Sequence, residues 1–227
     1  MTIWRTPDFW RGYGRTLRCF EMSAQLDLFS QDAPQFDAAF TAARRFELPP
    51  DAWLDFVPGW LRGHQSLFDT LVATVRFKAE RRVMYDRLVE VPRLYATLGE
   101  DGPCPPLVSA MRRVLSTRYG ETFERVSLGY YRDGRDSVAF HGDRIARVLP
   151  EALVATVSVG AARRFLLRPN AGGSSLSFLL GRGDLLVMGG SCQRTWQHAI
   201  PKSRAAREPR IAIMFRPHWP EPSAAQR

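Results

Sequence analysis

The second half of the chain carries short apolar segments, several with alternating polar positions, a pattern typical of β-strands. The segments are divided by turn-forming sequences such as Asp133-Gly134 and Gly189-Gly190. We expect strands at 125–131, 137–141, 152–159, 163–168, 175–180, 184–188, 194–199 and 210–216. About eight strands at this spacing predict a sandwich, barrel or jelly roll.

The first half of the chain has apolar positions at helical spacing. In one stretch Leu67, Leu71 and Val75 fall on one helical face. Expected helices lie at 66–80 and 105–119, and 83–97 is expected to be extended. Residues 31–63 are polar, with prolines and aromatic rings, and should wrap the core with short helices. The pattern predicts an α+β fold in which N-terminal helices pack on a β core.

The organisation along the chain suggests three parts. Residues 1–49 form an N-terminal arm, 50–217 a single domain and 218–227 a C-terminal tail. Within the arm, residues 1–21 show no helical or strand period. Two interpretations stay open: Met22 is the natural start, or the preceding residues are a genuine, loosely ordered arm.

Composition excludes several classes of protein. The chain has 227 residues, of which 45% are hydrophobic, so it can bury a substantial core and is not a disordered protein. No run of about 18 apolar residues is present, which argues against a membrane-spanning helix. No secretory signal pattern opens the sequence. We therefore expect a cytoplasmic protein with no membrane association, and a monomer.

Cysteine and charge narrow the picture further. The three cysteines are far apart, which excludes a disulfide framework and fits a reducing compartment. Lysine and arginine number 32 against 23 acidic residues, for a formal net charge of +9. This surplus suggests a polyanionic partner, with nucleic acid as the leading candidate.

Three of the polar side chains match a metal site. His141 and Asp143 stand two positions apart on or beside an expected strand, so their side chains point to the same face. His198 follows near the end of a later strand. Two histidines and a carboxylate on one face of a metal are the ligand set of non-haem Fe(II) oxygenases. The alternative for the His-x-Asp pair alone is a surface histidine beside a turn aspartate.

Two arginines in the last expected strand suggest an anionic ligand. Arg210 and Arg216 are six positions apart, so both side chains face the same way, with apolar residues between them. Inward-facing arginines are costly without anions, and a dicarboxylate could pair with both. The alternative is an edge strand with two solvated arginines.

These motifs together resemble the AlkB family of Fe(II)- and 2-oxoglutarate-dependent dioxygenases. The resemblance rests on His-x-Asp, the distal histidine and Arg-x5-Arg, and it covers roughly residues 50–217. Tyr131-Arg132-Asp133-Gly134 resembles the family's run before the metal histidine. Gly183 to Met188 is similar to the strand leading to the distal histidine, and Val91-Pro92-Arg93 to part of the substrate-binding lid. The resemblance implies a double-stranded β-helix (jelly-roll) core.

The resemblance also implies roles for individual residues. It assigns iron to His141, Asp143 and His198, and 2-oxoglutarate to Tyr131, Arg210 and Arg216. It assigns the substrate base to Tyr85, which would stack on it, and to Arg93 in the lid. Trp196 shares a strand face with His198 and is expected to line the site.

Three positions depart from the family pattern. Gly129 stands where an asparagine usually precedes the tyrosine, and Ala212 stands where an asparagine often follows the first arginine. Ile145 replaces an acid that helps to read the base in several members. The first two departures bear on 2-oxoglutarate affinity and the third on base preference.

The implied activity is oxidative demethylation of N-alkylated bases in DNA, such as 1-methyladenine and 3-methylcytosine. The reaction would use Fe(II), 2-oxoglutarate and O₂ and release formaldehyde and succinate. Such lesions pair badly, so extruding them from a duplex costs little. The alternatives are a related oxygenase acting on RNA or protein, and a non-catalytic nucleic-acid-binding module.

A separate motif lies in the arm. Gln25-Leu26-Asp27-Leu28-Phe29 resembles the pentapeptide with which bacterial proteins bind the sliding clamp. In that docking mode Gln25 would be hydrogen-bonded while Leu26, Leu28 and Phe29 contribute apolar contacts. The alternative is that the three apolar side chains anchor the arm to the protein's own core.

Overall fold

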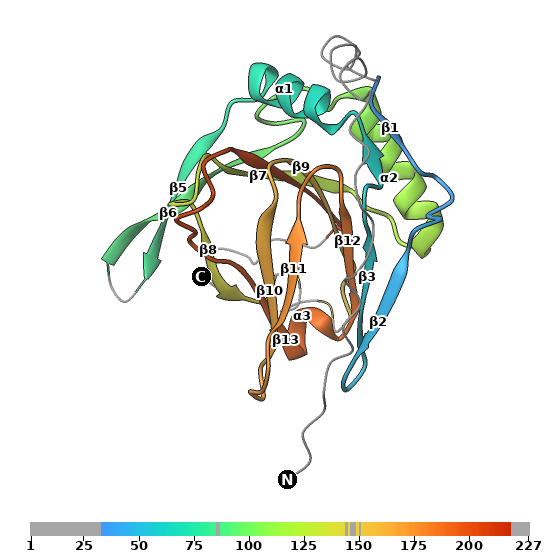
Figure 1. Ribbon diagram of the computed structural model, residues 1–227, viewed down its shortest axis with the longest axis vertical. Helices are drawn as coiled ribbons and strands as arrows, with labels where there is room; N and C mark the ends of the chain where they lie inside the picture. The colour runs from blue at the N-terminus through green and yellow to red at the C-terminus, as the bar shows by residue number, and fades with distance from the viewer. Residues whose placement is uncertain (1–32, 85–86, 144, 146–148, 150, 219–227) are drawn as a thin grey trace, which may run out of the picture. The chain divides into compact units, whose positions relative to one another are not determined.

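The chain folds around two antiparallel β-sheets (Figure 1). The computed structural model describes residues 33–84, 87–143, 145, 149 and 151–218, and the side chains of all of these except 80–84 and 87–90. Within these residues the larger sheet has eight strands. In spatial order they are β2 (Arg44–Leu48), β3 (Ala52–Val57), β12 (Leu185–Gly190), β9 (Val154–Gly160), β14 (Arg210–Arg216), β7 (Arg125–Tyr131), β6 (Arg87–Thr97) and β5 (Lys78–Met84).

The smaller sheet has four strands among the described residues. In spatial order they are β11 (Leu176–Leu180), β10 (Arg163–Pro169), β13 (Trp196–Ile200) and β8 (Val138–His141). The remaining elements are a two-stranded pair, β1 (Gln35–Phe36) with β4 (Leu61–Arg62), and the helices α1 (His64–Thr74), α2 (Pro106–Tyr119) and α3 (Cys192–Thr195). Two facing antiparallel sheets agree with the predicted jelly-roll core.

Alternation along β9 shows how the sequence builds both faces of the larger sheet. All seven of its residues are buried. Val157 and Val159 belong to the core on the helix side, whereas Val154 belongs to the core between the sheets. A strand covered on both faces reads as a nearly continuous apolar run. The two polar residues within it, Thr156 and Ser158, lie on the same face as Val154, so they point into the space between the sheets.

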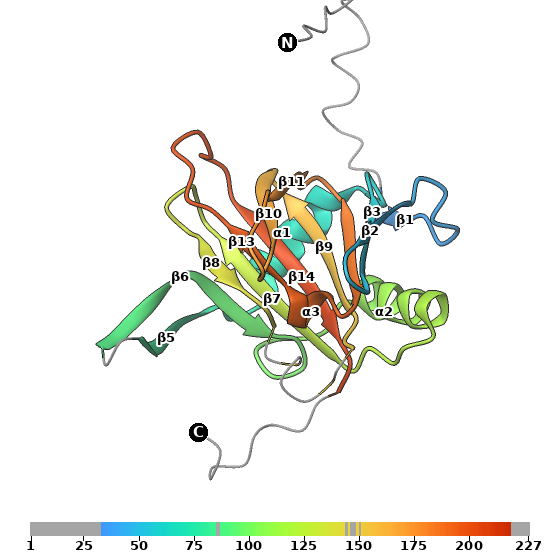
Figure 2. The same cartoon turned by 90° about the horizontal axis from the view of Figure 1, so that it is seen from below.

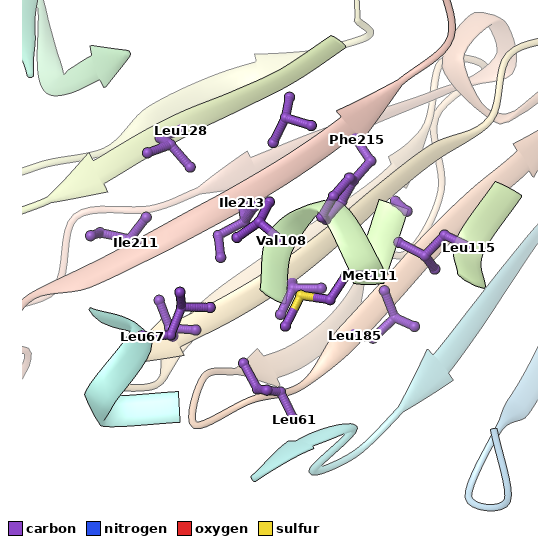
Figure 3. Close-up of a cluster of buried hydrophobic side chains, with 14 of the residues drawn as sticks. Leu61, Leu67, Val108, Met111, Leu115, Leu128, Leu185, Ile211, Ile213 and Phe215 are labelled. Carbon is purple, nitrogen blue, oxygen red and sulfur yellow. The ribbon is translucent and has the colours of Figure 1, made fainter. Parts of the chain in front are cut away.

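Two hydrophobic clusters cover the two faces of the larger sheet. The cluster in Figure 3 joins helix residues such as Leu67 and Met111 to strand residues such as Leu128 and Ile213. The second cluster lies between the sheets, where Phe165 and Leu167 of the smaller sheet meet residues of the larger one. Figure 2 shows that the β5–β6 ribbon, at the edge of the larger sheet, projects outward from the rest of the fold.

The expected helix at 66–80 is wrong over its last six residues. Helix α1 ends at Thr74, Val75 is extended, and β5 begins at Lys78. Val75 is buried all the same. Its spacing of four from Leu71 suggested another helical turn, but an extended residue occupies the same apolar core.

The short helices expected within 31–63 are also wrong, because this segment contains β1 to β4. Both faces of β3 are covered, which hides the alternation that marks a half-exposed strand. On one face Trp53 stacks on Tyr119 of α2 at a centroid distance of 5.9 Å. On the other face Phe56 packs against Phe178 of the smaller sheet.

Some predictions lie outside the described residues. They are the clamp-like peptide at 25–29, the alternative start at Met22, the stacking residue Tyr85 and almost all of the tail 218–227. Strand β2 lies within the segment expected to be the arm (1–49), and it pairs with β3 throughout its length.

Candidate active site

The three expected metal ligands come together at the smaller sheet. His141 ends β8 and pairs directly with His198 in β13, so the two rings lie 4.3 Å apart between centroids. Asp143 follows two residues after His141. Ligand atoms of the three side chains all lie within 4.8 Å of one another. This confirms that the sequence motif forms one cluster.

The histidines present the same ring nitrogen to the carboxylate. Nδ1 of His141 lies 2.8 Å from the carbonyl oxygen of Ala139, which leaves Nε2 facing the cluster. Nε2 of His141 and Nε2 of His198 lie 3.7 and 3.8 Å from the same Asp143 oxygen. Phe165 stacks on the His198 ring and holds its plane. A histidine fixed through one nitrogen and open at the other is a typical metal ligand.

Asp143 is held by a group from the larger sheet and a group from helix α3. Arg216 donates from Nε to its Oδ2 at 2.8 Å and from Nη1 to the Ser127 hydroxyl at 2.7 Å. The backbone amide of Asp143 donates to the side-chain oxygen of Gln193 at 2.9 Å. Burial alone would raise the pKa of Asp143, but the charge and hydrogen bond of Arg216 act together with His198 and His141 to outweigh it, so the pKa lies well below its usual range. The carboxylate is therefore ionised and ready to bind a cation.

Burial also keeps both histidines neutral. It lowers the pKa of His198 to about 3 and the pKa of His141 in the same direction. Neutral imidazole is the form that binds metal. Two neutral imidazoles and one carboxylate fit Fe(II), and the cluster could hold it with positions left for further ligands.

The metal-free protein should lose stability as the pH falls from about 6.5 toward 4. In this window His198 takes up a proton in the unfolded chain but stays neutral in the folded one. Each such group contributes roughly 1.4 kcal/mol per pH unit, lost on acidification. The lowered pKa of Asp143 acts with the same sign below about 4. Urea unfolding at pH 7 and pH 5 measures the slope. A slope unchanged in His198→Gln would contradict this assignment.

Gly142 lets the chain pass between the ligands. A Cβ at this position would lie 2.3 Å from the backbone oxygen of Gln193, which cannot move without shifting α3. We expect Gly142→Ala to displace Asp143 from the histidines. A misplacement of about 1 Å can reduce turnover by about 100-fold. Succinate formation measures the loss, and circular dichroism checks that the fold is kept. Full turnover with bound iron would show that the loop tolerates the methyl group.

A second group of side chains lies on the larger sheet. Arg210 pairs with Tyr131 in the β14–β7 register, and both are almost fully buried. Two guanidinium groups lie near the Tyr131 ring, with Cζ of Arg210 at 5.4 Å and Cζ of Arg163 at 5.7 Å from its centroid. Nη2 of Arg210 donates to Ser158 at 2.7 Å.

The rest of the Arg210 guanidinium is unsatisfied. Within the described residues, Nε and Nη1 are buried and have no hydrogen-bond partner. Burial lowers the pKa of Arg210 to about 10, but the group stays charged near neutral pH. A buried cation whose Nε and Nη1 donors lack partners fits an anionic group such as a carboxylate, which would accept charge-assisted hydrogen bonds from it. These residues therefore fit the dicarboxylate 2-oxoglutarate.

Arg216 and Trp196 have different partners from those of Arg210 and Tyr131. Arg216 is turned to Asp143, so it links the dicarboxylate side of the site to the metal side. Trp196 is buried in the core between the sheets, and its indole donates to the carbonyl oxygen of Pro49 at 2.9 Å. Arg93 is buried and donates from Nη1 to the Tyr131 hydroxyl at 3.2 Å.

Three polar residues that support the site were not anticipated. Ser158 accepts from Arg210, Ser127 accepts from Arg216, and Gln193 holds the Asp143 amide. A signal existed for Ser158, because a hydroxyl in the apolar run of β9 needs a partner. Nothing in the sequence marks Gln193, which reaches the site from the short helix α3.

Comparison with known proteins gives the family. Residues 72–216 match the model of the 2OG-Fe(II) oxygenase superfamily. Alpha-ketoglutarate-dependent dioxygenase alkB homolog 3 of Bos taurus is 30% identical over 191 residues, which cover 74% of this chain and 67% of that protein. The chain belongs to the AlkB family of Fe(II)/2-oxoglutarate dioxygenases. It is an enzyme that uses Fe(II), 2-oxoglutarate and O₂.

Other AlkB-family relatives agree. The Homo sapiens DNA oxidative demethylase ALKBH2 is 29% identical over 147 residues, 56% of this chain and 56% of that protein. The match to Homo sapiens alkB homolog 3 spans 63% of that protein. The solved structure of OsALKBH1 has the same fold, with a TM-score of 0.51 at 14% identity over 77% of this chain and all of that one. None of the helices in the described part of the chain has the length and apolarity needed to cross a bilayer.

Proposed function

We propose that this dioxygenase removes N-alkyl groups from bases such as 1-methyladenine and 3-methylcytosine in DNA. The observation that carries the proposal is the cluster of His141, Asp143 and His198. The buried Arg210, whose Nε and Nη1 lack a partner among the described residues, supports it. Relatives with this family's fold are named DNA oxidative demethylase, which supports a nucleic-acid base as substrate. The net charge of +9 suits a polyanion.

In this proposal the chain's own residues bind and orient the reactants. His141, Asp143 and His198 would hold iron, which when bound supplies the oxidising chemistry. Arg210 would donate charge-assisted hydrogen bonds to a carboxylate of 2-oxoglutarate. Arg216 keeps Asp143 ionised and in place. The products would be succinate, CO₂, formaldehyde and the restored base.

The test is mass spectrometry of methylated oligonucleotides after incubation with Fe(II), 2-oxoglutarate and O₂. We expect loss of the methyl mass from 1-methyladenine or 3-methylcytosine in DNA. His141→Ala should abolish it while oligonucleotide binding remains. His218→Ala is the matched control, because His218 is an exposed histidine paired with Glu124 outside the site. Succinate formation with no demethylation of any DNA oligonucleotide would overturn the proposed substrate.

The same assay separates the alternatives. Preferred demethylation of RNA would indicate an RNA oxygenase, and turnover of a protein substrate alone would indicate a protein oxygenase. Oligonucleotide binding without succinate formation would indicate a non-catalytic binding module. The site argues against the last alternative, because a buried cation with open donors is costly unless it binds an anion.

We also propose that the peptide at 25–29 binds a bacterial sliding clamp, and that the enzyme is a cytoplasmic monomer. The support for the clamp is the five-residue match Gln25 to Phe29. A pull-down with purified clamp should retain the wild-type chain, and Leu28→Ala with Phe29→Ala should lose it. Equal retention of both proteins would end this proposal. Sedimentation velocity tests whether the enzyme is a monomer.

A further inference from the structure

Two of the three departures from the family pattern lie next to each other in the structure. Gly129 of β7 pairs directly with Ala212 of β14. They form the centre of a cross-strand row that continues to Tyr95 on one side and Ser158 on the other. Two positions that usually carry amide side chains in the family therefore adjoin one another, beside Tyr131 and Arg210. The loss of both amides removes hydrogen-bond donors from one place in the site.

Arg93 lies over this place. A Cβ added at Gly129 would touch Nη1 of Arg93 at 3.7 Å, the Tyr131 ring at 3.6 Å and the Met214 methyl at 3.6 Å. Of the three groups, only the guanidinium is a hydrogen-bond donor at its contacting atom. The amide of an asparagine at 129 would extend beyond that Cβ and compete with the guanidinium for the same region.

The Arg93 guanidinium also fixes the Tyr131 hydroxyl. Nη1 donates to the Tyr131 oxygen at 3.2 Å. A hydroxyl has one proton to donate, and a guanidinium can only donate. Because the phenol oxygen accepts from Arg93, its own proton is directed elsewhere and is free for an acceptor such as a carboxylate. Arg93 is 8% exposed, so this contact is made inside the protein.

We infer that Arg93 is a positioning residue of the 2-oxoglutarate site, where it orients the Tyr131 hydroxyl and supplies the positive charge that replaces the two missing amides. This differs from the role in the substrate lid that the sequence resemblance implied. The inference rests on the dioxygenase chemistry and not on the identity of the methylated base. Arg163 cannot take the same role, because its donors are engaged by the carbonyl oxygens of Asp133, Asp136 and Pro201.

The direct test is calorimetry of 2-oxoglutarate binding to the Fe(II)-loaded protein without oxygen or nucleic acid. Arg93→Ala should weaken binding about tenfold, as expected for loss of one charge-assisted hydrogen bond. The affinity of Arg93→Lys, which keeps a charged donor, should lie between those of the wild type and Arg93→Ala. Tyr131→Phe combined with Arg93→Ala should bind about as weakly as the weaker single variant, because the two residues act as one unit. Arg164→Ala, an exposed arginine on β10, is the control.

A rescue experiment distinguishes positioning from general damage. Gly129→Asn alone should weaken 2-oxoglutarate binding, because its amide competes with Arg93. In the Arg93→Ala background the same substitution should restore binding to within about threefold of the wild type. A variant that had merely lost packing would not be rescued.

Unchanged 2-oxoglutarate binding in Arg93→Ala, with a raised KM for the oligonucleotide, would overturn this inference and return Arg93 to the substrate lid. Failure of the wild type to demethylate any oligonucleotide would overturn the proposed substrate instead. That result leaves the comparison of 2-oxoglutarate binding intact, so the two failures are distinguishable.

Discussion

Arg210→Met should make the ligand-free protein more stable and unable to bind 2-oxoglutarate. The guanidinium is fully buried and, among the described residues, two of its nitrogens have no hydrogen-bond partner. Replacing such a buried ion with an apolar side chain of similar length is commonly neutral or stabilising, and here we expect a gain of about 1–2 kcal/mol. Urea unfolding without ligand measures this gain.

The same substitution should reduce affinity for 2-oxoglutarate by at least about 100-fold, because a charge-assisted contact with a carboxylate is lost in a buried site. Calorimetry measures the affinity. Arg164→Met is the matched control, since it removes an exposed arginine, and both quantities should stay close to wild type. A ligand-free Arg210→Met that is less stable than wild type by more than 1–2 kcal/mol would show that Tyr131 and Ser158 already satisfy the cation.

Asp143→Ala should abolish iron binding and turnover and also destabilise the fold. Arg216 loses its carboxylate partner and, among the described residues, keeps the Ser127 hydroxyl and the Met214 sulfur. An uncompensated buried charge costs about 3–5 kcal/mol. Urea unfolding of the metal-free protein measures this cost, and titration with Fe(II) measures the metal site. Asp69→Ala, at an exposed position on α1, is the control.

A double variant separates the two effects of Asp143. Arg216→Met in the Asp143→Ala background removes the stranded charge, so most of the lost stability should return. Turnover should stay absent, because the metal ligand is still missing. A double variant as unstable as Asp143→Ala would mean that the cost comes from packing and not from charge.

The sequence predicted the β core well because period-2 alternation and turn residues are local signals. Strands β7 and β14 match the expected 125–131 and 210–216 at both ends. Part of the cluster of candidate ligands was also predictable, since the spacing of His-x-Asp keeps the two side chains close together. Strand β3 was missed because its two covered faces erase the alternation.

What the sequence could not show is proximity between elements. Gly129 and Ala212 appear as two unrelated departures along the chain, and only the β7–β14 register makes them neighbours. Likewise Arg93 is far from Tyr131 in sequence, and the hydrogen bond between them depends on the side-chain path across two strands. Such pairings are set by tertiary packing, for which a single sequence carries no direct signal.

The site draws its two halves from opposite layers. The histidines stand on the smaller sheet, and Arg210, Arg216 and Tyr131 stand on the larger one. The hydrophobic core between the sheets, which includes Phe165 and Leu167, therefore sets the distance between the metal site and the cosubstrate site. A methylene added or removed there would change this distance without replacing any candidate ligand. Apolar residues that take no part in the reaction thus set a distance on which the reaction depends.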